Sequence, residues 1–325
     1  MLFSIVIPVY NVKEYIRKCV GSILANSFSD YEVLLVDDGS TDGSDLLCDA
    51  MAEESGGRVR VFHQENQGPG CARNTGIAAA QGEYLFFVDS DDSLKSDALE
   101  RLAAAVKKYQ ADIIAYDFFS DDGEGRLRPM SANRGKVGAP FTLAKQPEFL
   151  LSVPGVWQRI WRRTLFDKGV SFPNRVWYED ICTVTKLFAL AEKIVILPER
   201  PYCYLSRPGS IMNSRVLPRN REIITAMEDV LGWYQEKGLF DQYQKELCAL
   251  TVEHVLLVAS VRVARIDPKS PILQELSSYV SKRFPDFQKN YYIRQFPRLK
   301  RLALCLICHK RYGLLRRLFQ LKDGK

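Results

Sequence analysis

Three aspartates, Asp89, Asp91 and Asp92, stand within four positions directly after an apolar run. The run, residues 84–88, predicts a short strand that is buried on both faces. Ligands of open α/β sheets bind beyond the carboxyl ends of the strands, so these carboxylates have the position of a binding site. Because they repel one another, a cation or many hydrogen-bond donors must offset their charge. The sequence predicts a Mg²⁺ or Mn²⁺ site completed by substrate phosphates; the alternative is a solvated turn that caps the next helix.

The composition is that of an ordinary soluble protein, with 46% hydrophobic and 26% charged residues among 325. This length allows one large or two moderate domains. No apolar run approaches the roughly 20 residues that span a bilayer, and the first residues lack the features of a signal peptide. We therefore expect a cytoplasmic protein whose chain begins with a strand.

The eight cysteines are scattered, which favours reduced thiols over a disulfide framework. Residues 305–309, Cys-Leu-Ile-Cys-His, match the pattern for covalent haem attachment. That reaction requires an exported chain, and two cysteines with one histidine are short of a structural zinc set. We expect no cofactor at this segment.

Apolar runs and helical periodicities alternate along the first 118 residues. The order strand, helix, strand implies a parallel sheet, and Asn11 with Glu14 resembles a capping box at the start of the first helix. We expect an α/β domain of the nucleotide-binding type, with a mainly parallel sheet flanked by helices. Strands are predicted over residues 3–7, 31–36, 59–63, 84–88 and 112–118, and helices after Asn11, near 44–53, after 66–76 and over 96–108.

The pattern changes in the second half of the chain. Residues 120–140 predict a loop or a hairpin, and 142–205 mix short helices with strands near 193–197 and 201–205. After Pro218 the sequence becomes helical, and we expect a helical C-terminal region with helices at 219–237, 240–265 and 271–283.

Three polar clusters follow predicted strands: residues 8–11, 37–40 and 89–92. Parallel strands place their carboxyl ends at one edge of a sheet, so we expect the clusters to converge. Convergent carbonyls with a carboxylate suit a pyrimidine base, whose N3–H must donate. A carboxylate pair beside a cation suits a diphosphate.

These clusters, together with segments 66–76 and 82–84, resemble the family 2 glycosyltransferases in order and spacing. The resemblance covers about residues 1–215 and implies the GT-A fold, a nucleotide-sugar donor that is mostly a UDP-sugar, and inversion at the anomeric carbon. It implies a catalytic domain over 1–215, with a donor half at 1–118 and an acceptor half at 119–215.

The resemblance also implies roles for residues of the donor half. Pro8 and Tyr10 would flank the uracil, and Asp38 would accept its N3–H. Asp89 would contact the ribose, and Asp91 would ligate the Mg²⁺ or Mn²⁺ ion that bridges the diphosphate.

Three arginines occupy positions that the resemblance singles out. Arg73 would contact the nucleotide, with a surface or helix-capping role as the alternative. Arg159 replaces the lysine of a Trp-x-Lys segment, so a shared role there is open, because arginine keeps the charge but changes its geometry. Arg207, in a segment that runs from Tyr202 to Ser210, would reach the diphosphate or have no role.

Two acids, Glu179 and Asp180, precede an apolar helix in the second half. Carboxylates stabilise the first turn of a helix, and capping alone would explain them. The pair also resembles the family's Glu-Asp motif, in which the second acid deprotonates the acceptor hydroxyl. One carboxylate is sufficient for an inverting displacement, and we assign Asp180 as the catalytic base, with Glu179 as a neighbour.

Residues 291–325 form a basic tail that carries a charge of +9, while the preceding residues sum to −3. The tail has two apolar stripes, at 299–307 and 314–319, each beside basic residues. Short basic amphipathic helices bind anionic membrane surfaces, and a helix docked on its own domain is the alternative. The interleaved aromatic and basic residues of an RNA-binding module are missing, so we expect no nucleic acid partner.

The sequence therefore predicts a metal-dependent, inverting glycosyltransferase. It would move a hexosyl or N-acetylhexosaminyl group from a UDP-sugar to a glycan acceptor, lipid-linked at the inner face of the cell membrane, in surface polysaccharide biosynthesis. A non-catalytic nucleotide-sugar-binding or assembly protein is the alternative. A phosphatase with an aspartate nucleophile is less favoured, because its Asp-x-Asp pair follows the first strand and Asp89 follows a later one.

Overall fold

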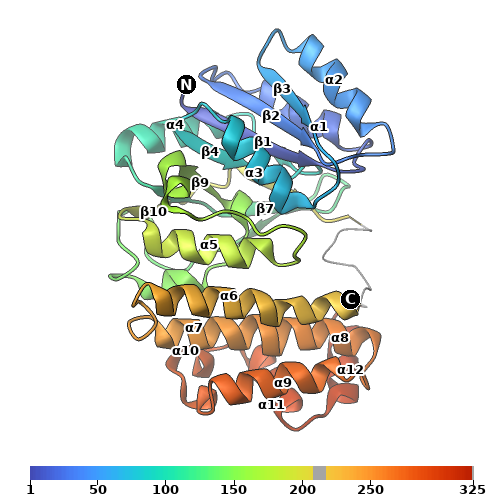
Figure 1. Cartoon of the computed structure of the whole chain (residues 1–325), viewed down its shortest axis with the longest axis vertical. Helices are drawn as coiled ribbons and strands as arrows, with labels where there is room; N and C mark the ends of the chain where they lie inside the picture. The colour runs from blue at the N-terminus through green and yellow to red at the C-terminus, as the bar shows by residue number, and fades with distance from the viewer. Residues whose placement is uncertain (208–216, 324–325) are drawn as a thin grey trace. The chain divides into compact units, whose positions relative to one another are not determined.

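The computed structural model describes residues 1–207 and 217–323, and residues 208–210 of the segment that resembles the family lie outside them. The chain forms two compact units, Met1–Ser210 and Ile211–Lys325 (Figure 1). The first unit is a mixed α/β domain, and the second is helical, as the sequence predicts.

The first unit contains a seven-stranded and a four-stranded sheet. Its strands are β1 (Phe3–Val9), β2 (Tyr31–Asp37), β3 (Val59–His63), β4 (Tyr84–Phe87), β5 (Ser93–Leu94), β6 (Ile113–Ala115), β7 (Phe118–Asp121), β8 (Leu127–Met130), β9 (Arg159–Arg162), β10 (Ile194–Ile196) and β11 (Tyr202–Leu205). Its α-helices are α1 (Ile16–Leu24), α2 (Ser44–Glu54), α3 (Pro69–Ala79), α4 (Ala98–Tyr109) and α5 (Glu179–Leu190).

The large sheet has the order β10-β6-β9-β4-β1-β2-β3. β1 lies between β2 and β4 and is parallel to both, with Val9 opposite Asp37 and Val6 opposite Phe87. β9 is antiparallel to both of its neighbours, β4 and β6. The three strands that precede the polar clusters are therefore adjacent, and their carboxyl ends share one edge, as predicted.

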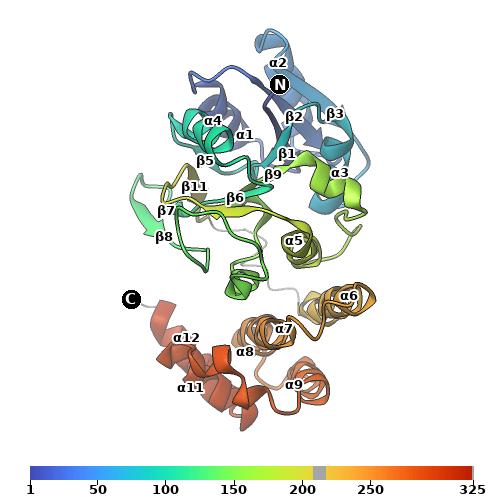
Figure 2. The same ribbon diagram turned by 90° about the vertical axis from the view of Figure 1, so that its left-hand side faces the viewer.

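Alternate residues of β1 explain how helices cover both faces of this sheet. Ile5 and Ile7 lie in a core cluster with buried residues of α1, α2 and α4. Val6 faces the other way and contacts α3, where a Cβ at Gly76 would overlap its side chain. Figure 2 shows α1 and α4 on one side of the strands and α3 on the other. Gly76 thus lets α3 lie directly against β1.

The predicted strand 112–118 is divided between two strands, β6 and β7, because the chain changes sheets in its middle. β6 ends at Ala115, and Tyr116 turns inward, where its hydroxyl donates to the Trp157 carbonyl. Asp117 then accepts hydrogen bonds from Ser131 and Ala132. β7 begins in the four-stranded sheet, whose order is β5-β11-β7-β8, and its antiparallel pairing with β8 is the hairpin expected within 120–140.

The predicted capping box is also wrong. α1 begins at Ile16, and the Asn11 side chain accepts the Thr41 N–H, 2.8 Å away, in a loop contact. Asn11 has a φ of 51°, outside the helical region.

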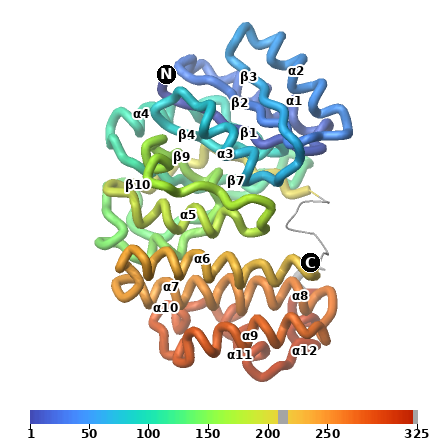
Figure 3. Tube along the Cα trace, in the orientation of Figure 1, coloured from blue at the N-terminus to red at the C-terminus, as the bar shows by residue number. Residues whose placement is uncertain are grey.

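The second unit consists of helices, which Figure 3 traces from orange to red. They are α6 (Glu222–Glu236), α7 (Gln244–Thr251), a π-helical segment (Val252–Ala259), α8 (Ser260–Ile266), α9 (Ile272–Arg283), α10 (Tyr291–Arg294), α11 (Arg298–Cys308) and α12 (Tyr312–Asp323), with short 3-10 helices at Pro218–Arg221 and Phe287–Lys289.

One continuous helix of the second unit, Gln244–Ile266, corrects the expectation of no membrane-length apolar run. Its 23 residues are long and apolar enough to cross a membrane by length and composition. Because 72% of its apolar window is buried, the burial favours a core helix.

The two stripes of the basic tail are mostly docked on the second unit. α11 packs on the π-helical segment and α12 on α8. Ala303, Ile307 and Leu315 are buried, whereas Leu302 and Leu314 are 47% and 51% exposed. Most apolar residues of the two stripes are therefore packed against other helices of the second unit, which was the alternative to membrane binding.

Candidate active site

The clusters that follow β1 and β2 meet at the edge of the large sheet. The Asp38 N–H donates to the Val9 carbonyl, 2.8 Å away, which joins the ends of the two strands. Pro8 lies within β1 and is partly buried, and Tyr10, just beyond the strand, is 49% exposed. The predicted uracil residues Pro8, Tyr10 and Asp38 therefore occur on adjacent strand ends.

Asp38 is 2% exposed and is held by neutral donors. Its Oδ1 accepts the Gln67 N–H at 2.9 Å and Gln64 Nε2 at 2.7 Å, and its Oδ2 accepts the Gly68 N–H at 2.8 Å. Gly68, with φ 93°, directly precedes α3, and a side chain is strained in that conformation. A carboxylate offers about four lone-pair sites, and donors from the described residues occupy three of them, which leaves one site on Oδ2 for a further donor.

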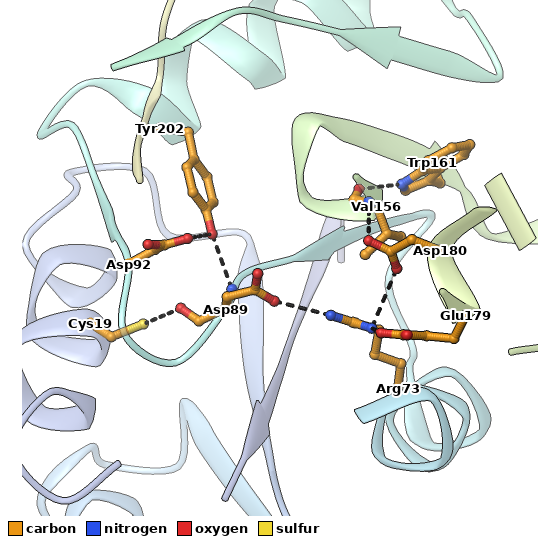
Figure 4. Close-up of polar contacts among 9 residues, drawn as sticks. All are labelled: Cys19, Arg73, Asp89, Asp92, Val156, Trp161, Glu179, Asp180 and Tyr202. Carbon is orange, nitrogen blue, oxygen red and sulfur yellow. Dashed lines mark hydrogen bonds and ion pairs between the residues drawn. The ribbon is translucent and has the colours of Figure 1, made fainter. Parts of the chain in front are cut away.

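The second cluster of the site surrounds Arg73 on α3, between Asp89 on one side and Glu179 and Asp180 on the other (Figure 4). Its guanidinium donates to Asp89 Oδ1 at 3.1 Å, Glu179 Oε1 at 2.8 Å and Asp180 Oδ1 at 3.4 Å. The Arg73 side chain is 5% exposed and lies over the Phe172 ring. The surface and helix-cap alternatives for Arg73 are therefore wrong.

Asp180 stands at the first turn of α5, with its side chain 24% exposed. Its Oδ2 accepts the Val156 N–H at 3.2 Å. Desolvation raises the pKa of Asp180 to about 7, with Arg73 opposing the shift and Glu179 and Asp89 adding to it. A carboxyl with this pKa is matched to proton transfer at neutral pH.

The three acids of the 89–92 run have separate partners. Asp89 pairs with Arg73, and desolvation raises its pKa while Arg73 lowers it. Asp92 is buried and accepts the Tyr202 hydroxyl at 2.6 Å and the Leu205 N–H at 2.7 Å. The same Tyr202 oxygen accepts the Asp89 N–H. Asp92 thus fixes the turn against β11.

Asp91 accepts Arg207 Nε at 2.6 Å, and its side chain is 21% exposed. The Arg207 guanidinium lies over the Tyr15 ring, 4.6 Å from its centroid. The structure therefore brings together the predicted metal residue and the predicted diphosphate contact.

Within the described residues, no group of three or more His, Cys, Asp or Glu side chains is arranged to hold a metal ion. Mg²⁺ often uses only one or two carboxylates, with phosphates and waters completing its shell. Asp89 is paired with the buried Arg73 and Asp92 with the buried Tyr202, whereas the partner of Asp91 is the partly exposed Arg207, so Asp91 is the acid that best fits this mode. The donor set fits a metal that arrives with a diphosphate better than a preformed cage.

Two contributors to the site were missed from the sequence, the Val156 N–H and the Tyr202 hydroxyl, and each binds another site residue. Asp92 was predicted as one of the clustered acids, but its role of binding Tyr202 was not. Asp92 could have been separated from its neighbours only by knowing that β11 packs beside it. The Val156 contribution is a backbone group, for which the side-chain pattern carries no signal.

Residues 4–169 match the family described as Glycosyl transferase family 2. The chain belongs to this family. Its seven-stranded, mainly parallel sheet and flanking helices are the GT-A fold expected from the motifs.

The curated relatives of this chain include proteins named as glycosyltransferases. The uncharacterized glycosyltransferase EpsJ of Bacillus subtilis is 30% identical over 98% of this chain and 95% of its own length. Glycosyltransferase GlyG of Streptococcus pneumoniae is 35% identical over 66% of this chain and 73% of its own length.

Among solved structures, residues 1–349 of Staphylococcus aureus TarS in complex with UDP-GlcNAc share the fold of this family 2 member. The TM-score is 0.65 at 21% identity, over 100% of this chain and 93% of that one. The mannosyltransferase PcManGT of Pyrobaculum calidifontis, in complex with GDP-Man and Mn²⁺, has a TM-score of 0.58 at 15% identity, over 99% of this chain and 88% of that one.

Proposed function

We propose that this family 2 member transfers a sugar from a UDP-sugar donor to a hydroxyl of a glycan acceptor, with inversion at the anomeric carbon. The observation that carries the proposal is Asp180: a largely buried carboxyl, with a pKa raised to about 7, in one ion network with Asp89. Because Arg73 binds both Asp180, the proposed base, and Asp89, the proposed ribose contact, the acceptor and the donor would be held close together, as a direct displacement requires.

The donor is assigned to residues 1–118 and the acceptor to 119–215. Pro8 and Tyr10 flank the uracil, and the open lone pair of Asp38 Oδ2 accepts its N3–H. Asp89 contacts the ribose. The bound UDP-GlcNAc in the TarS structure, which has the same fold, supports a UDP-sugar donor.

Asp91 is the residue that would hold Mg²⁺ or Mn²⁺. A bound metal would offset negative charge on the departing diphosphate, so no acid need protonate that group. The Mn²⁺ in the PcManGT complex supports this assignment. Arg207, which pairs with Asp91 Oδ2 in the structure, would contact the diphosphate. Arg73 would position the ribose contact Asp89, with which it forms an ion pair.

In the reaction, Asp180 takes the proton of the acceptor hydroxyl while that oxygen attacks C1 from the face opposite the diphosphate. The bond between C1 and the diphosphate oxygen breaks, and UDP leaves with the electron pair. At a pKa of about 7, Asp180 is substantially ionised at neutral pH and still basic enough to receive the proton.

A UDP-release assay tests the proposal with UDP-glucose, UDP-galactose and their N-acetyl forms as donors. Asp180→Asn should lower turnover by about 100-fold or more while UDP still binds, because general bases contribute this much. Asp91→Asn should weaken UDP binding in the presence of Mg²⁺ or Mn²⁺. Asp97→Asn, at an exposed ion pair with Arg101, is the matched control.

Unchanged turnover in the folded Asp180→Asn variant would refute the assignment of the base. UDP binding without turnover on any glycan acceptor would instead favour a non-catalytic nucleotide-sugar-binding protein.

We also propose that the acceptor is lipid-linked, in surface polysaccharide biosynthesis, and that the tail 291–325 binds an anionic membrane at the cytoplasmic face. Support comes from the exposed arginines of α11 and α12, among them Arg298, Arg301 and Arg317, beside the exposed Leu302 and Leu314. Basic residues beside apolar side chains are attracted to anionic lipid headgroups.

Vesicles that contain phosphatidylglycerol test the membrane proposal by co-sedimentation. Arg298→Glu with Arg301→Glu should lower the bound fraction several-fold, since each basic residue near the surface contributes about 1 kcal/mol. Lys245→Glu with Lys282→Glu, at exposed positions of the same unit, is the control. Equal sedimentation of both variants would remove the proposal.

A further inference from the structure

Arg159 on β9 is a charged side chain that the proposed reaction does not use. The residue is fully buried, and among the described residues no carboxylate lies within ion-pair distance of it. Its guanidinium is 4.7 Å from the centroid of Phe188 and 5.5 Å from that of Phe149. Burying a charge costs free energy unless polar groups surround it. The hydrogen-bond partners of Arg159 therefore indicate which part of the structure the buried guanidinium stabilises.

The partners of Arg159 are neutral oxygens of one loop and one neighbouring amide. Nη1 donates to the Gly155 carbonyl at 2.8 Å, and Nη2 donates to the Val153 carbonyl at 3.0 Å. Nη2 also donates to Asn133 Oδ1 at 3.1 Å, and Gln158 Oε1 is 3.4 Å from Nη1. The planar guanidinium thereby binds the backbone of the first half of the turn 153–158, with a longer contact to the Gln158 side chain at its other end.

This turn carries the backbone group that binds the proposed base. The Val156 N–H donates to Asp180 Oδ2, and the Val156 carbonyl accepts Trp161 Nε1 at 3.0 Å (Figure 4). Phe188, which lies against the Arg159 guanidinium, is on α5, the helix that begins beside Asp180. Arg159 therefore contacts both the turn and the helix that meet at the carboxylate.

We propose that Arg159 is a positioning residue for Asp180: it holds the turn 153–158 so that the Val156 N–H remains on the carboxylate, and it adds a second positive charge behind the base. The inference rests on the proposed role of Asp180 as general base. Lysine could supply the charge but, as a compact point charge, not the planar fork that binds two carbonyls and an amide at once.

The effect of a substitution at Arg159 on the ionisation of Asp180 depends on the other charged groups around that carboxylate. Arg73 faces the carboxylate from α3, Glu179 from α5 and Asp89 from the turn after β4. Desolvation lowers the pKa of Arg159, and the charges of Tyr116 and Asp180 raise it. The positive charge and the Val156 N–H both favour the ionised carboxylate, and losing either should make Asp180 harder to ionise.

Arg159→Lys and Arg159→Met test the proposal through the pH dependence of kcat. In Arg159→Met, the acid limb should move to higher pH by about half a unit or more, since both stabilising terms are weakened. At pH 7, a shift of about half a unit should lower kcat about twofold through the smaller ionised fraction, and misplacement of the carboxylate should lower it further. The KM for the donor should change little, because the donor half is untouched. Arg159→Lys should show a smaller shift of the limb.

Arg162→Lys is the matched control, because it lies on the same strand and pairs with Glu83 and Asp112 instead of the turn. Its acid limb and kcat should match those of the wild type. If Arg159→Met does not fold, Arg159→Lys decides, since it keeps the charge and most of the volume. A folded Arg159 variant with an unmoved acid limb and unchanged kcat would overturn the proposal. The Asp180→Asn assay tests the base itself independently of this result.

Discussion

Asp38 and Asp180 are both shielded carboxylates connected to α3, yet their charges are balanced in different ways. Asp38 accepts hydrogen bonds from Gln64, Gln67 and Gly68, all neutral donors in the loop between β3 and α3. Asp180 shares one cation, Arg73, with two other acids.

The difference separates recognition from proton transfer. Asp38 is fixed by short-range donors and keeps one lone pair for a ligand, which suits an acceptor that does not change its state. Asp180 shares Arg73 with Glu179 and Asp89, and desolvation raises its pKa to about 7, which suits a group that gains a proton during the reaction. Helix α3 connects the two, because its start binds Asp38 and its Arg73 binds Asp180.

Of the substitutions that test this comparison, Arg73→Met should have the largest effect on stability. It would leave Asp89, Glu179 and Asp180 without their shared cation, and breaking a buried ion pair on one side costs about 3–5 kcal/mol. Urea unfolding should show a loss of this size in the free energy of unfolding. Arg162→Met removes partly exposed pairs and should cost about 1 kcal/mol. An equal loss in the free energy of unfolding in the two variants would show that the buried Arg73 network stabilises the fold no more than a partly exposed ion pair does.

Asp38→Asn tests the recognition side. An amide keeps one acceptor oxygen, so at least one of the three donors loses its partner, at about 1–3 kcal/mol. Steady-state kinetics should show a donor KM raised more than kcat is lowered, the opposite of Asp180→Asn. A loss confined to kcat would contradict the assignment of Asp38 to the nucleotide.

The smallest effect concerns His63, which lies between Asp37 Oδ2 and Asp49 Oδ1 beside the Asp38 loop. Hydrogen bonds to Asp37 and Asp49 raise its pKa. The protonated ring therefore stabilises the fold below the unfolded pKa, and this contribution is lost as the pH rises through the folded pKa.

His63→Gln should accordingly lower the free energy of unfolding by about 0.5 kcal/mol or less near pH 6, since the ring is 46% exposed. By pH 8.5 the difference from the wild type should shrink. A difference that grows with pH would show that the two carboxylates do not act on the ring in this way.

The strands and the edge where they end could be predicted, because uninterrupted apolar runs such as 84–88 indicate buried strands and parallel order fixes which ends meet. The break at Tyr116 could not, because the whole stretch 112–118 is compatible with one strand. What ends β6 is the tertiary contact of Tyr116 with Trp157, 41 residues away.

The buried arginines show the second limit. Arginine is a residue type that usually lies on the surface, yet Arg73 and Arg159 are buried. Their hydrogen-bond partners are distant in the sequence, as Glu179 is from Arg73 by 106 residues, so the local pattern could not predict them. In the tail, the periodicity located an apolar stripe correctly, but it could not distinguish a stripe that faces lipid from one docked on α8.

The central claim is that Asp180 must be ionised for turnover, and the pH dependence of kcat at saturating donor and acceptor tests it most directly. We predict a rate that falls about tenfold per unit below an apparent pKa near 7 and is level above it, with the protein folded throughout by circular dichroism. A rate that stays level down to pH 5 would contradict the account.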